Sequence, residues 1–394
     1  MVRLRHFWSN PSRTGARASK AIYAVATAAA ATGHVPKRAG ASAAALVILL
    51  VACAAPGPRL LHFGMQDAPE GRRLMWPAAP EVPRFMYAGQ LVGEANFKVT
   101  PAQADGVGGL MRRLAAFIVG EQAPTVLQRP QSGTVDAAGR ILVTDASRQA
   151  VFVFDPAAGE LLVWDKADGL ANFVAPIGIA SGANGQILVA DAELGIVARL
   201  DSRGNPGRAI GRGVLKRPTG LAYDAVHQRI FVADTYMHDV KVFDEDGQLL
   251  KVIGRQGEAA GEFNFPTFLA FARGELYVAD TMNSRIQVFA DGGERWRSSF
   301  GRRGLYVGNL VRPKGVAVDS DGNIYVVESY YDHLLVFNRD GDFLMAIGGL
   351  GQETGKFYLP AGAWVDSRNR VFVGDMFNGR VVVFQYLETG GDGG

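Results

Sequence analysis

The sequence predicts an all-β fold: a six-bladed β-propeller of four-stranded antiparallel blades, with a short helical insertion before the first blade. Two observations predict it. An alternating apolar segment that contains an acid recurs six times, and a proline opens each unit, at positions 130, 176, 218, 266, 313 and 360. Successive prolines are 46, 42, 48, 47 and 47 residues apart. Repeats of about 40–50 residues that each hold four short strands are typical of propeller blades.

The unit that follows Pro313 shows the internal pattern. It reads "KGVAVD", the turn "SDGN", "IYVVE", a second turn, "HLLVFN" and "RDGDFLMAIG". These are four short runs in which apolar residues alternate, separated by turns rich in Gly, Asp and Asn. Such alternation predicts antiparallel strands joined by tight turns.

Each unit carries one acid at the end of its second predicted strand, with a large apolar residue nine positions later. A short side-chain carboxylate in this place can accept hydrogen bonds from backbone N–H groups of the turn. Because the acid recurs in all six units, we interpret it as structural, since catalysis requires an asymmetric group of residues. The six acids are Asp145, Asp191, Asp234, Asp280, Glu328 and Asp375.

The last unit stops within ten residues of Phe384 and so lacks a fourth strand. The segment "PRFMYAGQLVG" at 83–93 resembles the fourth strands "GQLLKVIG" and "GDFLMAIG". We therefore expect Phe85–Val92 to pair with Val381–Phe384. This pairing would close the ring and remove the exposed sheet edges that promote aggregation.

The units carry the sequence features of a known repeat. Segments such as "YVADTMNSRIQVF" and "FVGDMFNGRVVVF", after a Pro-x-Gly start in most units, resemble the NHL repeat, and the linkers "GRQGEAAGEFNFP" and "GGLGQETGKFYLP" do so as well. The resemblance covers 125–387, with 83–93 as the closing strand. It implies a six-bladed propeller that acts in binding, and we expect a monomer.

The net charge of the whole chain, +3, hides an uneven distribution. The first 52 residues hold seven of the 41 basic residues and none of the 38 acidic ones, so the remainder has 34 basic and 38 acidic side chains and a net charge of −4. A net negative body excludes the broad basic field of a nucleic-acid-binding protein. We therefore expect no nucleic acid as a partner.

Residues 1–52 have the character of an export leader. A short apolar run follows Lys37 and Arg38 and ends in Leu-Val-Ala-Cys at Cys53, the only cysteine. This ending resembles the bacterial lipobox, which implies lipid attachment at Cys53 and an extracytoplasmic, membrane-anchored protein. Ala54 would by the same resemblance favour the outer membrane. The alternative is a buried structural cysteine. Residues 1–34 also suggest an over-extended gene start.

The remaining segments flank the blades. Residues 53–82 hold several prolines and are expected to form an extended tether. In 94–124 the sequence "TPAQ" has the form of a helix start, and "GLMRRLAAFIV" places apolar residues on one helical face, which predicts one or two short helices. Residues 388–394 are expected to be a disordered tail.

Two enzymatic readings rest on family resemblance and remain open. The lyase that cleaves hydroxyglycine peptides is an NHL-type propeller whose histidines bind zinc, whereas gluconolactonase-like propellers hold calcium on the axis. The histidines His62, His227, His238 and His333 do not share a repeat position, and His238 is expected to be a surface residue of the scaffold. The calcium candidates are Asn283, Glu328 and Asn378. We predict no catalytic residues and no cofactor, with calcium reserved for this alternative.

Cations recur just before the blade-opening prolines. Equivalent positions lie on one face of a propeller, where they would form an arc that binds carboxylates or phosphates of an envelope protein or an acidic glycan. The alternative is that these side chains are solvated and stack on their neighbours. The residues are Arg129, Lys216, Arg217, Arg302, Arg303, Arg312 and Lys314. The predicted function is that of a binding or assembly scaffold, with a metal-dependent hydrolase or lyase as the alternative.

Overall fold

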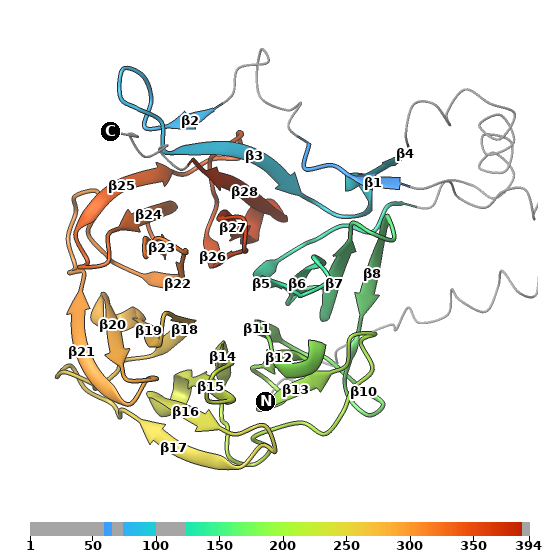
Figure 1. Cartoon of the computed structure of the whole chain (residues 1–394), viewed down its shortest axis with the longest axis vertical. Helices are drawn as coiled ribbons and strands as arrows, with labels where there is room; N and C mark the ends of the chain where they lie inside the picture. The colour runs from blue at the N-terminus through green and yellow to red at the C-terminus, as the bar shows by residue number, and fades with distance from the viewer. Residues whose placement is uncertain (1–58, 65–73, 100–122, 388–394) are drawn as a thin grey trace, which may run out of the picture. The chain divides into compact units, whose positions relative to one another are not determined.

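The computed structural model describes residues 59–64, 74–99 and 123–387. These residues form one unit, in which six antiparallel sheets stand around a common centre (Figure 1). The fold is therefore an all-β six-bladed propeller, as the repeat spacing predicts. No helix in the described ranges is long and apolar enough to cross a membrane.

The blades are numbered 1 to 6 in sequence order, and the first strand named for each blade is its innermost strand. Blade 1 comprises β5 (Pro130–Val135), β6 (Ile141–Asp145), β7 (Ala150–Asp155) and β8 (Glu160–Trp164), and blade 2 comprises β11 (Pro176–Ser181), β12 (Ile187–Asp191) and β13 (Ile196–Leu200). Blade 3 comprises β14 (Pro218–Asp224), β15 (Arg229–Asp234), β16 (Asp239–Phe243) and β17 (Leu249–Ile253), and blade 4 comprises β18 (Pro266–Ala272), β19 (Glu275–Asp280), β20 (Arg285–Ala290) and β21 (Arg295–Phe300). Blade 5 comprises β22 (Pro313–Val318), β23 (Ile324–Glu328), β24 (His333–Phe337) and β25 (Phe343–Gly348), and blade 6 comprises β26 (Pro360–Val365), β27 (Arg370–Asp375) and β28 (Arg380–Tyr386) with β3 (Phe85–Leu91) and β2 (Met75–Trp76).

The middle strands are buried on both faces because each blade lies between two others. In β6, Ile141 and Val143 belong to the apolar core shared with blade 6, whereas Leu142 belongs to the core shared with blade 2. Successive side chains of a strand point to opposite faces, so one strand supplies two cores. The outermost strands are less covered: in β17, Leu249, Leu250 and Val252 are exposed and Ile253 is buried.

The ring is closed by the N-terminal strand β3. It pairs antiparallel with β28, with Val381 opposite Leu91 and Phe384 opposite Tyr87. This is the pairing that the sequence predicts. Strand β2 adds a further edge to β3, so blade 6 has five strands drawn from both ends of the chain (Figure 1).

Blade 2 is a local exception to the four-stranded pattern. Its fourth strand is reduced to isolated bridges, which join Ile210 to Val197 and Pro206 to Leu200. Proline has no N–H to donate to a sheet, and glycines at 204, 207 and 211 favour irregular backbone. The short hairpin of β9 (Lys166–Asp168) and β10 (Ala171–Asn172) precedes this blade.

The expected extended tether at 53–82 is wrong for its described residues. Strand β1 (Arg59–Leu61) pairs with β4 (Phe97–Val99), and β2 belongs to blade 6. The Asn96 side chain joins these segments, because its amide donates to His62 O at 2.7 Å and Gln90 O at 2.8 Å while its oxygen accepts from Val92 N at 2.7 Å. The start of the predicted insertion, 94–99, is accordingly a 3-10 turn (Glu94–Asn96) and a strand.

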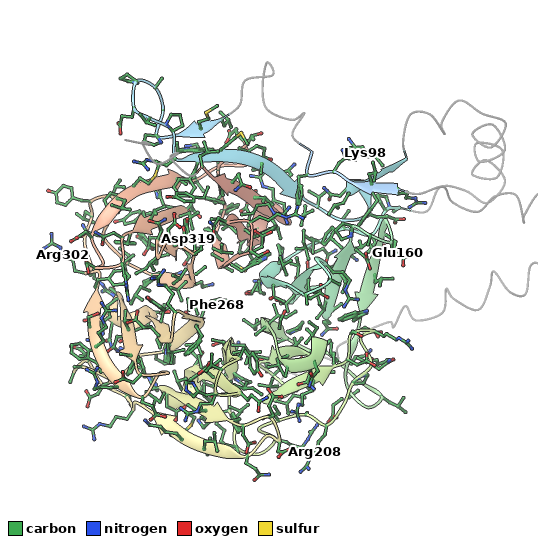
Figure 2. All side chains as sticks on the ribbon, viewed as in Figure 1. Lys98, Glu160, Arg208, Phe268, Arg302 and Asp319 are labelled. Carbon is green, nitrogen blue, oxygen red and sulfur yellow. The ribbon has the colours of Figure 1, made fainter. Side chains whose placement is uncertain are left out.

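The innermost strands approach one another closely at the axis. A side chain at Gly178, Gly220 or Gly362 would meet the backbone of the next blade, at Thr219 O, Thr267 O and Gln131 O. At these three positions only glycine leaves room for the neighbouring backbone. Blade 4 has Phe268 at the equivalent position, and this residue lies beside the central channel (Figure 2).

Several predicted segments lie outside the described residues. They are the leader at 1–52, Cys53, the helical part of the insertion at 100–122 and the tail at 388–394.

Replacement of Phe384 by alanine should destabilise the closed ring. Phe384 is fully buried at the closure and contacts the rings of Trp76, Tyr87 and Phe357. Truncation of such a side chain costs about 3–5 kcal/mol in the free energy of unfolding. Chemical denaturation measures this cost. Phe377→Ala, in the same blade but half exposed, is the control and should cost less than about 1 kcal/mol. Equal losses in the two variants would contradict the closure.

Candidate ligand-binding face

The six repeat acids lie at equivalent places and all are buried. In each blade the carboxylate accepts at least one hydrogen bond from a backbone N–H that comes just before the blade-opening proline. Asp145 accepts from Gln128 N at 2.6 Å and Arg129 N at 2.9 Å, and its other oxygen accepts from Ser147 N and Arg148 N in the following turn. The acid therefore joins the linker that enters a blade to the turn between the second and third strands. We call this arrangement the acid clamp.

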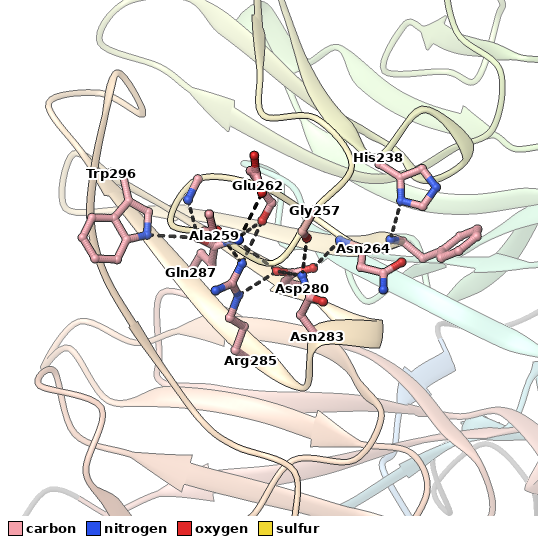
Figure 3. A network of polar contacts seen from close by, with 12 residues as sticks. His238, Gly257, Ala259, Glu262, Asn264, Asp280, Asn283, Arg285, Gln287 and Trp296 are labelled. Carbon is pink, nitrogen blue, oxygen red and sulfur yellow. Dashed lines mark hydrogen bonds and ion pairs between the residues drawn. The ribbon is translucent and has the colours of Figure 1, made fainter.

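Blades 4 and 6 complete the acid clamp with side chains. In blade 4, Asp280 accepts from Asn264 N at 2.7 Å, from the Asn283 amide at 2.9 Å and from Arg285 Nε at 2.8 Å (Figure 3). In blade 6, Asp375 accepts from Tyr358 N, Asn378 and Arg380 in the same way. Burial raises the pKa of Asp375 and of Glu328, and the hydrogen bonds that each carboxylate accepts oppose this rise.

These contacts also account for the residues that were considered for a calcium site. Asn283 and Asn378 each donate to the repeat acid of their own blade and to a linker carbonyl, at Gly257 O and Gly351 O. Glu328 accepts from Val311 N, Arg312 N and Tyr330 N. The three side chains serve separate clamps in blades 4, 5 and 6.

The expectation that His238 is a surface residue is wrong. His238 is buried, and its Nδ1 accepts a hydrogen bond from Phe265 N of blade 4 at 3.2 Å (Figure 3). Phe265 has a φ of 52°, which turns its N–H toward blade 3. In the same way, Asp332 of blade 5 accepts a hydrogen bond from Leu359 N of blade 6, at 2.6 Å. In blades 3 and 5 the side chain four positions after the repeat acid thus links neighbouring blades.

The other three histidines in the described part of the chain do not gather around a common point. His62 lies in the β1 segment, His227 bonds Asp224 at 2.6 Å in a hairpin turn of blade 3, and His333 begins β24 in blade 5, where burial lowers its pKa. Within the part of the chain that the structure describes, no group of three or more His, Cys, Asp or Glu side chains could hold a metal ion.

Three of the predicted cations stack on aromatic rings. The guanidinium of Arg129 lies 5.3 Å from the ring centre of Phe377, that of Arg217 5.0 Å from Tyr236, and that of Arg312 5.9 Å from Tyr330. The three aromatic residues are each two positions after a repeat acid, and all are exposed. Sequence reasoning missed these aromatic partners, although their constant offset from the acids was visible in the sequence.

Arg129 and Arg312 act electrostatically on Lys314. Burial lowers the pKa of the Lys314 ammonium, and the positive charges of Arg312 and Arg129 lower it further. Lys314 as a whole residue keeps partial exposure, yet its ammonium group is largely desolvated. Within residues 59–64, 74–99 and 123–387, none of the three side chains forms an ion pair. The structure therefore places positive charge from blades 1 and 5 near the Lys314 ammonium, which has no carboxylate within ion-pair distance among the described residues.

The other predicted cations are not part of this group. Arg217 pairs with Glu193 at 2.7 Å, and the backbone N–H of Lys216 belongs to the clamp of Asp234. Arg302 lies at the outer rim of the disc, far from the axis (Figure 2). Arg303, in the linker, contacts Ser284 in the blade 4 turn that follows Asp280. The single arc expected from the sequence is thus divided, because the linker between blades 4 and 5 carries Arg302 and Arg303 outward.

A central channel of about 230 Å³ runs along the axis and is lined by all six innermost strands. Polar atoms make up more of its surface than apolar atoms do, and its lining includes Trp364, which packs on Gly133. The Trp364 Nε1 group is buried and has no hydrogen-bond partner among the described residues.

Comparisons with known proteins agree with this architecture. Residues 223–293 and 309–390 match a family described as "6-bladed beta-propeller". The chain is 30% identical over 139 residues to protein brain tumor of Drosophila melanogaster and 30% identical over 155 residues to peptidyl-glycine alpha-amidating monooxygenase A of Xenopus laevis. These matches cover 34% and 35% of this chain but only 13% and 16% of the relatives. They support a six-bladed propeller with homology to NHL-repeat proteins.

Among solved structures, a gluconolactonase from Xanthomonas campestris is similar, with a TM-score of 0.52 and 19% identity, over 80% of this chain and 100% of that chain. A likeness at this level of identity concerns the fold alone.

Replacement of Asp191 by alanine should destabilise the propeller. It leaves Val174 N, Ala175 N, Glu193 N and Leu194 N without their acceptor, which costs about 2–5 kcal/mol in the free energy of unfolding. The control is Glu193→Ala in the same turn, an exposed side chain whose loss should cost less than about 1 kcal/mol. Chemical denaturation compares the two. An Asp191→Ala variant as stable as the control would refute the acid clamp.

Proposed function

We propose that the protein is a lipid-anchored, extracytoplasmic binding scaffold that holds an acidic ligand on the face of the propeller that carries the acid turns. The ligand would be an acidic glycan or a carboxylate-rich region of an envelope protein. Lys314, Arg312 and Arg129 would form the anion site, and the exposed rings of Tyr330 and Phe377 would flank it.

The observation that supports this proposal is the positive charge of Arg312 and Arg129 near the desolvated Lys314 ammonium, while none of the three side chains forms an ion pair within the described residues. A desolvated ammonium beside two guanidinium groups is unfavourable by itself, because like charges repel and burial penalises the charged ammonium. A bound carboxylate, sulfate or phosphate would remove this cost and add charge-assisted hydrogen bonds. The ligand would therefore gain more at this place than at an isolated surface lysine.

The stacked arginines suit such a ligand. Arg129 and Arg312 are held over Phe377 and Tyr330, so their guanidinium groups lose little conformational freedom when they bind an anion. Planar guanidinium groups bind carboxylates and phosphates through two parallel hydrogen bonds. Exposed aromatic rings next to them offer apolar surface to the rest of the ligand.

Lipid attachment at Cys53 would hold the propeller close to the membrane. Strand β1 begins at Arg59, which leaves five residues between it and Cys53. Six Cα steps span at most about 20 Å. The ligand would accordingly be bound near the membrane surface, on the outer membrane if Ala54 acts in sorting as the lipobox resemblance implies.

A metal-dependent hydrolase or lyase remains the alternative function, because part of the chain is similar to an amidating monooxygenase. Metal analysis of the purified protein separates the two. Stoichiometric zinc or calcium that survives dialysis would contradict the scaffold proposal, whereas a metal-free protein that binds anions would support it.

Replacement of Lys314 by methionine should change stability and anion binding in opposite directions. The melting temperature without added anion should rise, because a desolvated and repelled charge is removed. The upward shift that sulfate or polygalacturonate produces in the wild-type protein should disappear. Thermal denaturation of the full chain in detergent measures both effects.

The matched control for this experiment is Lys98→Met, an exposed lysine on β4. It should retain the full anion response. An unaltered response in Lys314→Met would rule out the anion site.

Replacement of Cys53 by serine should abolish lipid attachment, since the thiol is the acceptor in the lipobox reaction that the sequence resembles. Metabolic labelling with radioactive palmitate in a bacterial host should label the wild-type chain and not the variant. Label that persists in Cys53→Ser would contradict anchoring at this residue, although it would leave the anion site unaffected.

A further inference from the structure

The linker between blades 4 and 5 exposes three consecutive apolar side chains. Leu305 is 87% exposed, Tyr306 is 82% exposed and Val307 is 63% exposed. Two arginines, Arg302 and Arg303, precede them, with Gly304 in between. We call residues 302–309 the rim loop.

The rim loop has a defined structure that keeps its apolar tip in solvent. Its base is fixed by Leu310, which is fully buried and whose N–H donates to Arg302 O at 2.9 Å. Within the loop, Asn309 N donates to Tyr306 O at 3.0 Å. Gly308, at a φ of 95°, rests on the ring of Phe343, where a side chain would collide. The tip is therefore held outward by the same contacts that close the loop.

The rim loop lies over the turn of blade 4 that follows Asp280. Arg303 Nε donates to Ser284 Oγ at 3.4 Å, and Ser284 Oγ donates to Val311 O at 3.3 Å. This is the side of the propeller that carries the acid clamps. The Arg302 guanidinium extends from the outer rim and forms no ion pair with any residue in the described ranges (Figure 2).

We propose that the rim loop docks on the surface of a lipid bilayer that contains anionic headgroups. Leu305 and Val307 enter the boundary between headgroups and acyl chains, and Tyr306 lies at the headgroup level, where its ring is apolar and its hydroxyl stays hydrated. Arg302 and Arg303 bind lipid phosphates.

A membrane fits the rim loop better than a second protein does. Stable protein interfaces bury about 1,200–2,000 Å² of well-matched surface, and a projecting tip of three side chains offers only a small part of this. Insertion into a bilayer requires no shape-matched partner, and its strength grows with the apolar area buried plus the attraction between cations and anionic lipid. The two arginines provide that charge complementarity. This inference does not require the anion site at Lys314 or lipid attachment at Cys53.

Co-sedimentation with vesicles tests the proposal. The protein used is the chain from Pro58 to Gly394, which retains every described strand and the closed ring but not Cys53. It should bind vesicles of phosphatidylcholine and phosphatidylglycerol at 7:3 and bind pure phosphatidylcholine vesicles roughly tenfold or more weakly. The Leu305→Ser, Tyr306→Ser, Val307→Ser triple variant should lose roughly tenfold or more of the binding to the mixed vesicles. Arg302→Gln with Arg303→Gln should lose the preference for the anionic lipid.

Controls separate the rim loop from general effects of exposed side chains. Leu170→Ser and Val226→Ser remove apolar side chains that are 93% and 83% exposed on other loops, and both should bind as the wild type does. Lys314→Met should also bind vesicles normally. Vesicle binding therefore tests the rim loop independently of the proposed anion site. Thermal denaturation verifies that each variant is folded.

Three results would overturn the inference. The first is absence of binding to the mixed vesicles by the wild-type chain, and the second is undiminished binding by the triple variant. The third is a concentration-dependent dimer in light scattering that the triple variant loses, because this would identify the rim loop as a contact between copies of the chain.

Discussion

The architecture depends on hydrogen-bond acceptors for the backbone N–H groups at the start of each blade. The chain turns into the innermost strand at a proline, and the partly buried N–H groups just before that proline have no neighbouring strand to accept their hydrogen bonds. A buried N–H without an acceptor costs free energy comparable to a lost hydrogen bond. The repeat acid supplies the acceptor in every blade, from Gln128 and Arg129 in the first to Tyr358 in the last.

This requirement determines which residues remain available for function. The polar residues that recur, including Asn283, Asn378 and His238, are occupied by turns and by links between blades. What remains is irregular around the ring: the cations at Arg129, Arg312 and Lys314, and the projecting tip of the rim loop. Such departures from sixfold repetition are where a propeller can recognise a partner that lacks its symmetry.

The features that depend on local sequence pattern could be predicted from the sequence. Period-2 alternation and turn residues predicted the blades, and the likeness of 83–93 to the fourth strands predicted the closure. Features that depend on distant contacts were missed. Strands β1 and β2 are two or three residues long and lack any alternation, and the burial of His238 follows from the backbone conformation at Phe265, in another blade. Arg302 and Arg303 were grouped with the axial cations because they are close in sequence, but their linker extends outward.

Hydrogen exchange of individual backbone amides tests the acid clamp most directly. The amides of Val174, Ala175, Val311 and Arg312 belong to no strand, so only the carboxylates of Asp191 and Glu328 protect them. We expect these four amides to exchange as slowly as amides in the middle strands β12 and β23, because release of the clamp requires the blade to open. Exchange at the rate of exposed loops would contradict the account.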